Sequence, residues 1–188
     1  MSLIDKILFE SKVFLVEKKS TYKFGCVMLD LSFPNVSKIH DKIKKEDLYT
    51  EKDNDKYGIE KECHITLLYG LHKKVTDEDV ENIIDKYKLP AKVKILDVSL
   101  FENEKFDVLK FNVSCRLLHS INKKLKTLPF TSEYPDYKPH LTIAYIKKGK
   151  GKDYVKLFKE KEFELKPEKI SFSKPDGKKS YFKIQIEK

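Results

Sequence analysis

The stretch His-Ile-Thr-Leu-Leu-Tyr at residues 64–69 decides the fold, because His-Leu-Thr-Ile-Ala-Tyr at residues 140–145 repeats its pattern. Side chains two residues apart on a β-strand point to the same face. Each stretch therefore predicts a strand that carries a histidine and a threonine side by side, with apolar residues on the opposite face. The four polar residues are His64, Thr66, His140 and Thr142. The repeat predicts two equivalent halves of one polar site.

This pair of strands carries the residue types that acid–base chemistry on a phosphate needs. One imidazole accepts a proton while the other donates one, and two hydroxyl groups hydrogen-bond the phosphate oxygens. Taken singly, a strand histidine is more often a hydrogen-bonded structural residue, and threonine is common in strands whatever its role. Neither interpretation explains the same offset in both strands. The sequence predicts a phosphodiesterase that uses no metal, and it leaves open which histidine is the base.

The elements around the two histidine strands follow the same order in both halves of the chain. Hydrophobic periodicity and breakers predict strand, helix, histidine strand, helix and strand, found twice. Thr76 and Asp79 form a predicted capping box for the helix that ends before Pro90. We expect one catalytic domain over 1–188, with repeated lobes at about 22–102 and 104–188. The predicted fold class is α+β, with two antiparallel-rich sheets around a central cleft and helices outside.

Tyrosines are candidates for contacts with the substrate. Polar segments at 47–62 and 131–139 precede the two histidine strands, and segments of that length line a site when they carry function. Tyr57 and Tyr137 lie in them, and we expect their rings to stack on bases. Strict alternation instead predicts that Tyr69 and Tyr145 point away from the histidines and pack in the core.

Composition limits the classes of partner. With 188 residues and 40% hydrophobic content the chain suits one globular domain, and we expect no signal peptide or membrane span. Its three cysteines lack paired spacing, which favours a reducing, cytoplasmic location. The net charge of +9 favours an anionic substrate. Because Arg116 is the only arginine, we expect no stable partner among duplex nucleic acids.

Metal and cysteine chemistry are the alternatives to acid–base catalysis by the histidines. The chain has no H-x-H, HExxH or CxxC spacing to complete a metal site around the histidines, so we expect no metal and no cofactor. Cys63 adjoins His64, but neighbours on a strand face opposite ways. His40, His72 and His119 are expected to be ordinary residues, although His72 lies close enough to the first motif to edge the cleft.

The paired H-x-T strands resemble those of the two-histidine (2H) phosphoesterases, the superfamily of LigT-like 2',5'-RNA ligases and cyclic phosphodiesterases. Gly-Ile-Glu at 58–60 before the first motif, Gly70 after it, and Lys-Pro at 138–139 before the second motif are most similar to the phage anti-CBASS branch. That branch destroys the cyclic oligonucleotide signals of bacterial immunity. The resemblance implies the duplicated, two-lobed fold of the superfamily and a catalytic role for both histidines and both threonines.

The motifs and the resemblance together leave three functions to be tested. The leading one, implied by the resemblance, is cleavage of cyclic di- or trinucleotide signals, in the host cytosol if the chain is phage-encoded. The second is an enzyme of RNA ends that opens 2',3'-cyclic phosphates or handles 2',5' linkages with the same four residues. The third is a module that binds nucleotides without cleaving them, which the presence of both histidines and both threonines disfavours. The sequence does not indicate base preference, ring size or oligomeric state.

Overall fold

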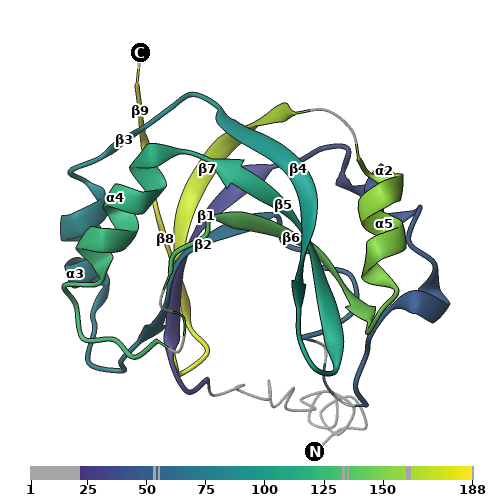
Figure 1. The fold of residues 1–188 in the computed structure, drawn as a ribbon. Coiled ribbons are helices and arrows are strands. Elements are labelled where there is room, and N and C mark those ends of the chain that lie inside the picture. The colour runs from purple at the N-terminus through teal and green to yellow at the C-terminus, as the bar shows by residue number, and fades with distance from the viewer. Residues whose placement is uncertain are drawn as a thin grey trace, which may run out of the picture.

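The computed structural model describes residues 22–52, 54, 56–132, 134, 136–159 and 162–187, and it has the predicted α+β class (Figure 1). The elements in chain order are β1 (Gly25–Ser32), α2 (Val36–His40), the 3-10 helix η1 (Lys45–Asp47), β2 (His64–Leu71), α3 (Asp77–Ile84), β3 (Lys88–Leu89), β4 (Val93–Glu102), β5 (Phe106–Ser114), α4 (Arg116–Leu125), β6 (His140–Lys147), α5 (Gly151–Leu157), β7 (Phe163–Ser173), β8 (Lys179–Phe182) and β9 (Gln185–Ile186). Both histidine strands begin at their histidine.

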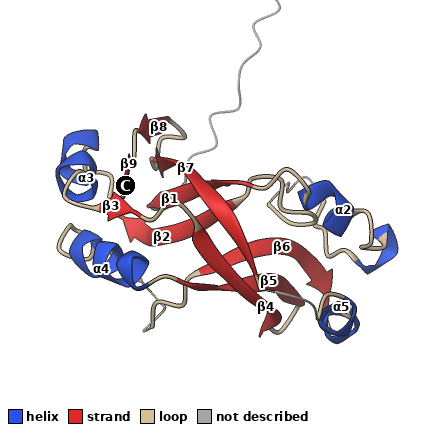
Figure 2. Cartoon of the chain, turned by 90° about the horizontal axis from the view of Figure 1, so that it is seen from above, coloured by secondary structure: helices blue, strands red, loops and turns tan. Residues whose placement is uncertain are grey.

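One antiparallel sheet organises the molecule. Its seven strands follow the order β1-β2-β6-β5-β4-β7-β8, and β1 also pairs with β7. The sheet arches, and β2 and β6 lie below β4 and β7 in the view of Figure 1. Helices α3 and α4 flank one end, and α2 and α5 flank the other (Figure 2). The sheet thus holds the two histidine strands side by side, between β1 and β5.

The two halves of the chain exchange strands. β4 comes from the first half of the sequence but pairs with β5, next to β6, whereas β7 comes from the second half and pairs with β1, next to β2. The exchanged strands also pair with each other, with Val93 opposite Leu165. Each histidine strand therefore lies in a group of paired strands that comes from both halves of the sequence, β2 with β1 and β7, and β6 with β5 and β4.

Local signals in the sequence fix the helices. Thr76 Oγ1 accepts a hydrogen bond from the Asp79 backbone N–H at 3.2 Å, and Asp79 Oδ2 accepts one from the Thr76 N–H at 2.8 Å, so the predicted capping box is confirmed. The buried side chains of α3 are Val80, Ile83 and Ile84, whose spacing places them on one face of the helix. On α4, Leu118, Ile121 and Leu125 are likewise buried.

The chain differs from the sequence prediction near its C-terminus. The repeated order of elements ends in two short strands in place of one, because β8 pairs with β7 while β9 pairs in parallel with β3. β3 was not predicted, since two residues are too few to show a period. On α5, Tyr154 is buried, but Leu157 is 53% exposed. Among the described residues no helix is long and apolar enough to span a bilayer.

Candidate active site

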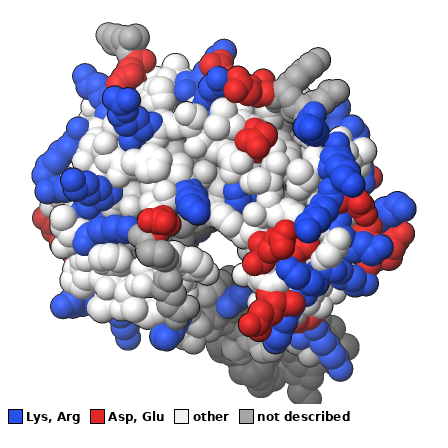
Figure 3. Space-filling view, in the orientation of Figure 1, with Lys and Arg blue, Asp and Glu red and all other residues white. Residues whose placement is uncertain are grey.

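The four predicted polar residues lie together at the contact between β2 and β6. The two strands pair antiparallel through Ile65 and Leu141. This register places His64 across from Thr142 and Thr66 across from His140. All four are half-buried, whereas Ile65 and Leu141 are buried on the opposite face. The four residues thus share one face of β2 and β6. The space-filling view shows a hollow in the molecule with basic and acidic side chains around it (Figure 3).

Both histidine rings are held in the same way. His64 Nδ1 lies 3.0 Å from the Glu62 carbonyl oxygen, and His140 Nδ1 lies 2.8 Å from the Lys138 carbonyl oxygen. A carbonyl oxygen only accepts hydrogen bonds, so each Nδ1 carries the hydrogen and donates. In the neutral ring each Nε2 then carries no hydrogen and can accept a proton. In both half-sites, the hydrogen bond from Nδ1 to the carbonyl two residues earlier fixes the orientation of the ring and thus the position of Nε2.

A β-bulge follows each H-x-T motif. Met28 pairs with Thr66 but Val27 pairs with Leu68, which leaves Leu67 as an extra residue in β2. In β6 the extra residue is Ile143, because Lys110 pairs with Thr142 and Leu109 with Ala144. At each bulge two consecutive side chains are buried. The alternation of faces is therefore reversed beyond each bulge.

The reversal corrects the prediction for the tyrosines at the ends of the motifs. Tyr69 and Tyr145 lie on the same face as the histidines, and Tyr69 is 45% exposed rather than part of the core. We call His64, Thr66 and Tyr69 the first half-site, and His140, Thr142 and Tyr145 the second half-site. The consecutive apolar residues between threonine and tyrosine were the available signal for a bulge.

Each segment before a histidine strand braces the other histidine strand. The segment before β2 contacts β6, since the Glu60 N–H donates to the Ile143 carbonyl at 3.0 Å and the Tyr145 N–H donates to the Gly58 carbonyl at 2.7 Å. The segment before β6 contacts β2, where the Thr131 N–H donates to the Gly70 carbonyl at 2.9 Å. These bonds lock the two half-sites together.

The two candidate stacking tyrosines have different surroundings. The Tyr137 hydroxyl donates to the Thr66 carbonyl at 3.1 Å, and burial raises the Tyr137 pKa, so this hydroxyl stays protonated. It braces the bulge of β2 together with Asn122, whose Nδ2 donates to the Leu67 carbonyl at 2.6 Å. Tyr57 instead lies edge-on to Tyr145, with ring centroids 5.3 Å apart. Tyr57 thus adjoins the second half-site, whereas Tyr137 supports the backbone of the first.

Acidic and thiol groups surround the first half-site. In the register of β1 and β2, Asp30 lies opposite His64, and Ser171 Oγ donates to Asp30 Oδ1 at 3.0 Å. Burial raises the pKa of Cys26 to about 12, and burial together with nearby carboxylates raises that of Cys63. Both thiols are protonated at neutral pH, so neither is an activated nucleophile.

A buried lysine distinguishes the second half-site. Asn112 lies opposite His140 and Lys110 opposite Thr142. The Lys110 side chain donates to Ser99 Oγ at 2.8 Å and to the Asn112 side-chain oxygen. Burial lowers the pKa of His140, an effect that its hydrogen bond to the Lys138 carbonyl opposes and the nearby charges of Lys110 and His64 reinforce. Sequence analysis missed Lys110, although a lysine within an apolar strand was a signal.

The remaining histidines contact residues other than the two motif histidines and threonines. His72 Nε2 contacts Thr131 Oγ1 at 2.8 Å, and His119 packs edge-on against Tyr137. His40 Nε2 is buried and has no hydrogen-bond partner among the described residues. Within the part of the chain that the structure describes, no three His, Cys, Asp or Glu residues are grouped to hold a metal ion.

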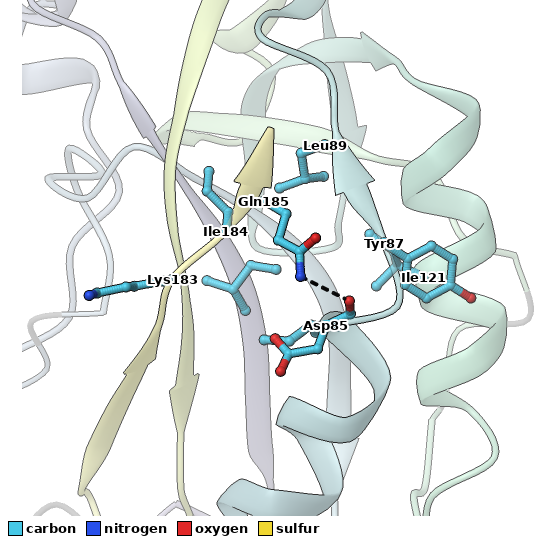
Figure 4. Close-up of a pocket in the computed structure, with 9 residues that line it drawn as sticks. Asp85, Tyr87, Leu89, Ile121, Lys183, Ile184 and Gln185 are labelled. Carbon is cyan, nitrogen blue, oxygen red and sulfur yellow. Dashed lines mark hydrogen bonds between the residues drawn. The ribbon is translucent and has the colours of Figure 1, made fainter. Parts of the chain in front are cut away.

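A small pocket lies apart from the half-sites, between α3, α4 and the β3–β9 pair (Figure 4). Ile84, Leu89 and Ile121 line it, and Gln185 Nε2 donates to the Asp85 carbonyl at its edge at 3.3 Å. A second, more open pocket lies between η1 and α5. Neither pocket includes a residue of the half-sites.

Comparisons with known proteins show one family match and several similar folds. The model of one family, described as anti-CBASS protein Acb1, matches residues 35–179. Usb1 of Kluyveromyces marxianus has a similar structure, with a TM-score of 0.53 at 12% identity over 87% of this chain and 99% of that chain. E. coli LigT, in a complex with NADP+, gives a TM-score of 0.47 at 12% identity over 87% of this chain and 95% of that one.

A structure of the same Usb1 with uridine monophosphate gives a TM-score of 0.52 at 12% identity over 86% of this chain and 98% of that chain. A search among curated proteins gave no match. Likeness at this level of identity shows the fold alone, and the fold agrees with the predicted duplicated class. The predicted resemblance to the anti-CBASS branch is confirmed by the family match.

Proposed function

We propose a function for this chain from the premise that it belongs to the family of anti-CBASS protein Acb1. It is a phosphodiesterase of the two-histidine class, and it degrades cyclic oligonucleotide signals and so counters CBASS immunity. The single observation that supports this chemistry best is the duplicated presentation of Nε2 on adjacent strands. We place the whole activity in one catalytic domain, acting in the cytosol where such signals are made.

The four polar residues have separate roles in the proposed reaction. One neutral imidazole takes a proton from the nucleophile, and the other, protonated, gives a proton to the leaving oxygen. Proton transfer by a positioned group is worth roughly 10²–10⁴-fold in rate. Thr66 and Thr142 donate hydrogen bonds to the nonbridging oxygens of the phosphate, and they favour the more negative transition state. We propose that no metal or cofactor takes part.

The ends of the two half-sites supply flat surfaces for bases. Tyr69 lies beside Phe24 at 6.1 Å between ring centroids, while Tyr145 lies in a cluster with Tyr57 and Phe106. Aromatic rings stack on any base, at about 1–3 kcal/mol each. Two such ends, one on each side of the histidines, suit a compact substrate with two or three bases. The net charge of +9 favours its phosphates.

The test is cleavage of defined substrates in the presence of EDTA. Purified protein is incubated with 3',3'-cyclic dinucleotides, cyclic trinucleotides and 2',3'-cyclic mononucleotides, and the products are separated by chromatography. The control is the double variant His64→Ala/His140→Ala. We expect cyclic oligonucleotides to be opened by the wild type only. Exclusive opening of 2',3'-cyclic ends would support the RNA-end function instead, and tight binding without cleavage of any compound would support the sequestering module.

The nucleophile is tested with an analogue. If the 2'-hydroxyl of the substrate attacks, the first product ends in a 2',3'-cyclic phosphate, which water then opens. A substrate with hydrogen in place of that hydroxyl keeps its charge and binds, but it resists cleavage. Efficient cleavage of the deoxy analogue would show that water attacks directly.

A further inference from the structure

The two half-sites match position by position except in charge. The strand beside each histidine strand places one residue opposite the histidine, Asp30 in β1 and Asn112 in β5. A serine from the next strand donates to each of these residues at 3.0 Å, Ser171 to Asp30 and Ser99 to Asn112. The residue opposite the threonine is Met28 in the first half-site and Lys110 in the second. The first half-site thus has the carboxylate of Asp30 where the second has the amide of Asn112. The second has the ammonium of Lys110 where the first has the uncharged Met28.

The ammonium in the second half-site is enclosed. Lys110 is 4% exposed, and its Nζ lies 4.3 Å from the centroid of the Phe101 ring, which is itself edge-on to His140 at 4.8 Å. A buried charge is screened less by water and salt than an exposed one. Other charged groups near His140 are Lys138 from the preceding segment, His64 from β2, and Asp97 from β4, whose Oδ1 accepts from Asn112.

The first half-site has charges of both signs. Glu62 pairs with Lys179 at 2.6 Å, and Asp30 lies near the same ammonium. Lys169 pairs in register with Asp30 and lies above the Tyr181 ring. Two carboxylates therefore offset two ammonium groups around His64. The buried Lys110 adjoins His140 and forms no direct ion pair with any residue that the structure describes. Burial and the adjoining ammonium both disfavour the protonated form of His140.

We propose that the buried Lys110 makes the half-sites unequal, so that His140 is the base and His64 the acid of the first cleavage step. This rests on the proposed function. The substrate 2'-oxygen forms a bond to phosphorus and gives its proton to His140 Nε2. The bond from phosphorus to the 5'-oxygen breaks, and that oxygen takes a proton from His64 Nε2. The step leaves His140 protonated and His64 neutral.

The second step restores the starting state. A water oxygen forms a bond to phosphorus and gives its proton to His64, while the 2'-oxygen leaves and takes the proton from His140. The two histidines exchange roles between the steps, and no outside proton is needed. Lys110 is a positioning residue in this scheme, because it acts through His140.

The first measurement is the titration of both imidazoles by NMR in the free protein. Lys110→Gln removes the charge but keeps a hydrogen-bond donor, and Lys110→Arg keeps the charge. The matched control is Lys94→Gln, since Lys94 is an exposed lysine on β4. We expect Lys110→Gln to raise the pKa of His140, because a nearby positive charge that disfavours the imidazolium is removed, and to change the titration of the second imidazole less. No rise, or an equal rise in both, would overturn the proposal.

The second measurement separates the acid from the base. In an analogue of the cyclic dinucleotide, sulfur replaces the bridging 5'-oxygen, and a thiolate leaves without a proton. We expect the defect of His64→Ala to shrink at least tenfold on this analogue, while the defect of His140→Ala persists. Rescue of His140→Ala instead, or of neither variant, would overturn the assignment with the proposed function intact. A wild-type protein that opens no cyclic dinucleotide would refute the proposed function itself.

Discussion

Both half-sites have an H-x-T motif, a β-bulge and a hydrogen bond from the histidine Nδ1 to a backbone carbonyl. The groups that support the two bulges nevertheless differ. Side chains brace the bulge of β2, through Asn122 and Tyr137, whereas the backbone of the segment before β2 braces β6 at Ile143. Tyr69 is exposed at the end of the first half-site, and Tyr145 is packed among other rings at the end of the second. The comparison teaches that two copies of one motif can have different surroundings, because the residues that pack against each copy are not themselves duplicated.

Loss of either histidine is expected to have the largest effect. His64→Ala and His140→Ala should each reduce turnover by roughly 10²–10⁴-fold, because acid and base act in one step. Folding should be intact, since both side chains are half-buried at an open face. Single-turnover rates and circular dichroism check this. A variant that retained the wild-type rate would show that one half-site suffices, and the comparison of two catalytic halves would fail.

The threonines test whether both half-sites hold the phosphate. Thr66→Val and Thr142→Val keep the shape of the side chain but remove the hydroxyl donor. Each should lower kcat by about 10²-fold, a typical cost of one lost donor to a developing oxyanion, and the double variant should be slower than either. Denaturation midpoints close to wild type would exclude damage to the strands. Normal cleavage by both single variants would mean that the phosphate is held elsewhere.

The cross-bracing of the half-sites is tested at a glycine. Gly70 has φ +109°, and a Cβ there would lie 1.9 Å from the Thr131 carbonyl oxygen. Gly70→Ala should therefore cost about 2–3 kcal/mol of unfolding free energy. The matched control is Gly149→Ala, where φ is +85° but nothing lies within 4 Å of the added Cβ, so only about 1 kcal/mol is expected. Equal losses in urea denaturation would show that the brace contributes nothing.

Much of this arrangement follows from the sequence. The capping box at Thr76, the helix faces and the four polar residues on one face were predictable, because they depend on local spacing. The exchange of β4 and β7 was not, since it is set by pairings distant in sequence. The face of Tyr69 was missed because a single extra residue, Leu67, reverses the alternation. The position of Lys110 beside the second half-site could not be predicted, because it depends on the pairing of β5 with β6.

The tyrosines at the ends of the half-sites give the smallest expected effect. Tyr69→Ala should raise KM for a cyclic dinucleotide by about tenfold, the low end of the value of one stacked base, with kcat and stability little changed. Tyr145→Ala should also lower the free energy of unfolding, because Tyr145 packs against Tyr57 and Phe106. The variants Tyr69→Phe and Tyr145→Phe keep the rings and serve as controls. If Tyr69→Ala left KM unchanged while Tyr145→Ala raised it, only the second half-site would contact a base. The inequality between the half-sites would then extend from the acid and the base to the binding of substrate.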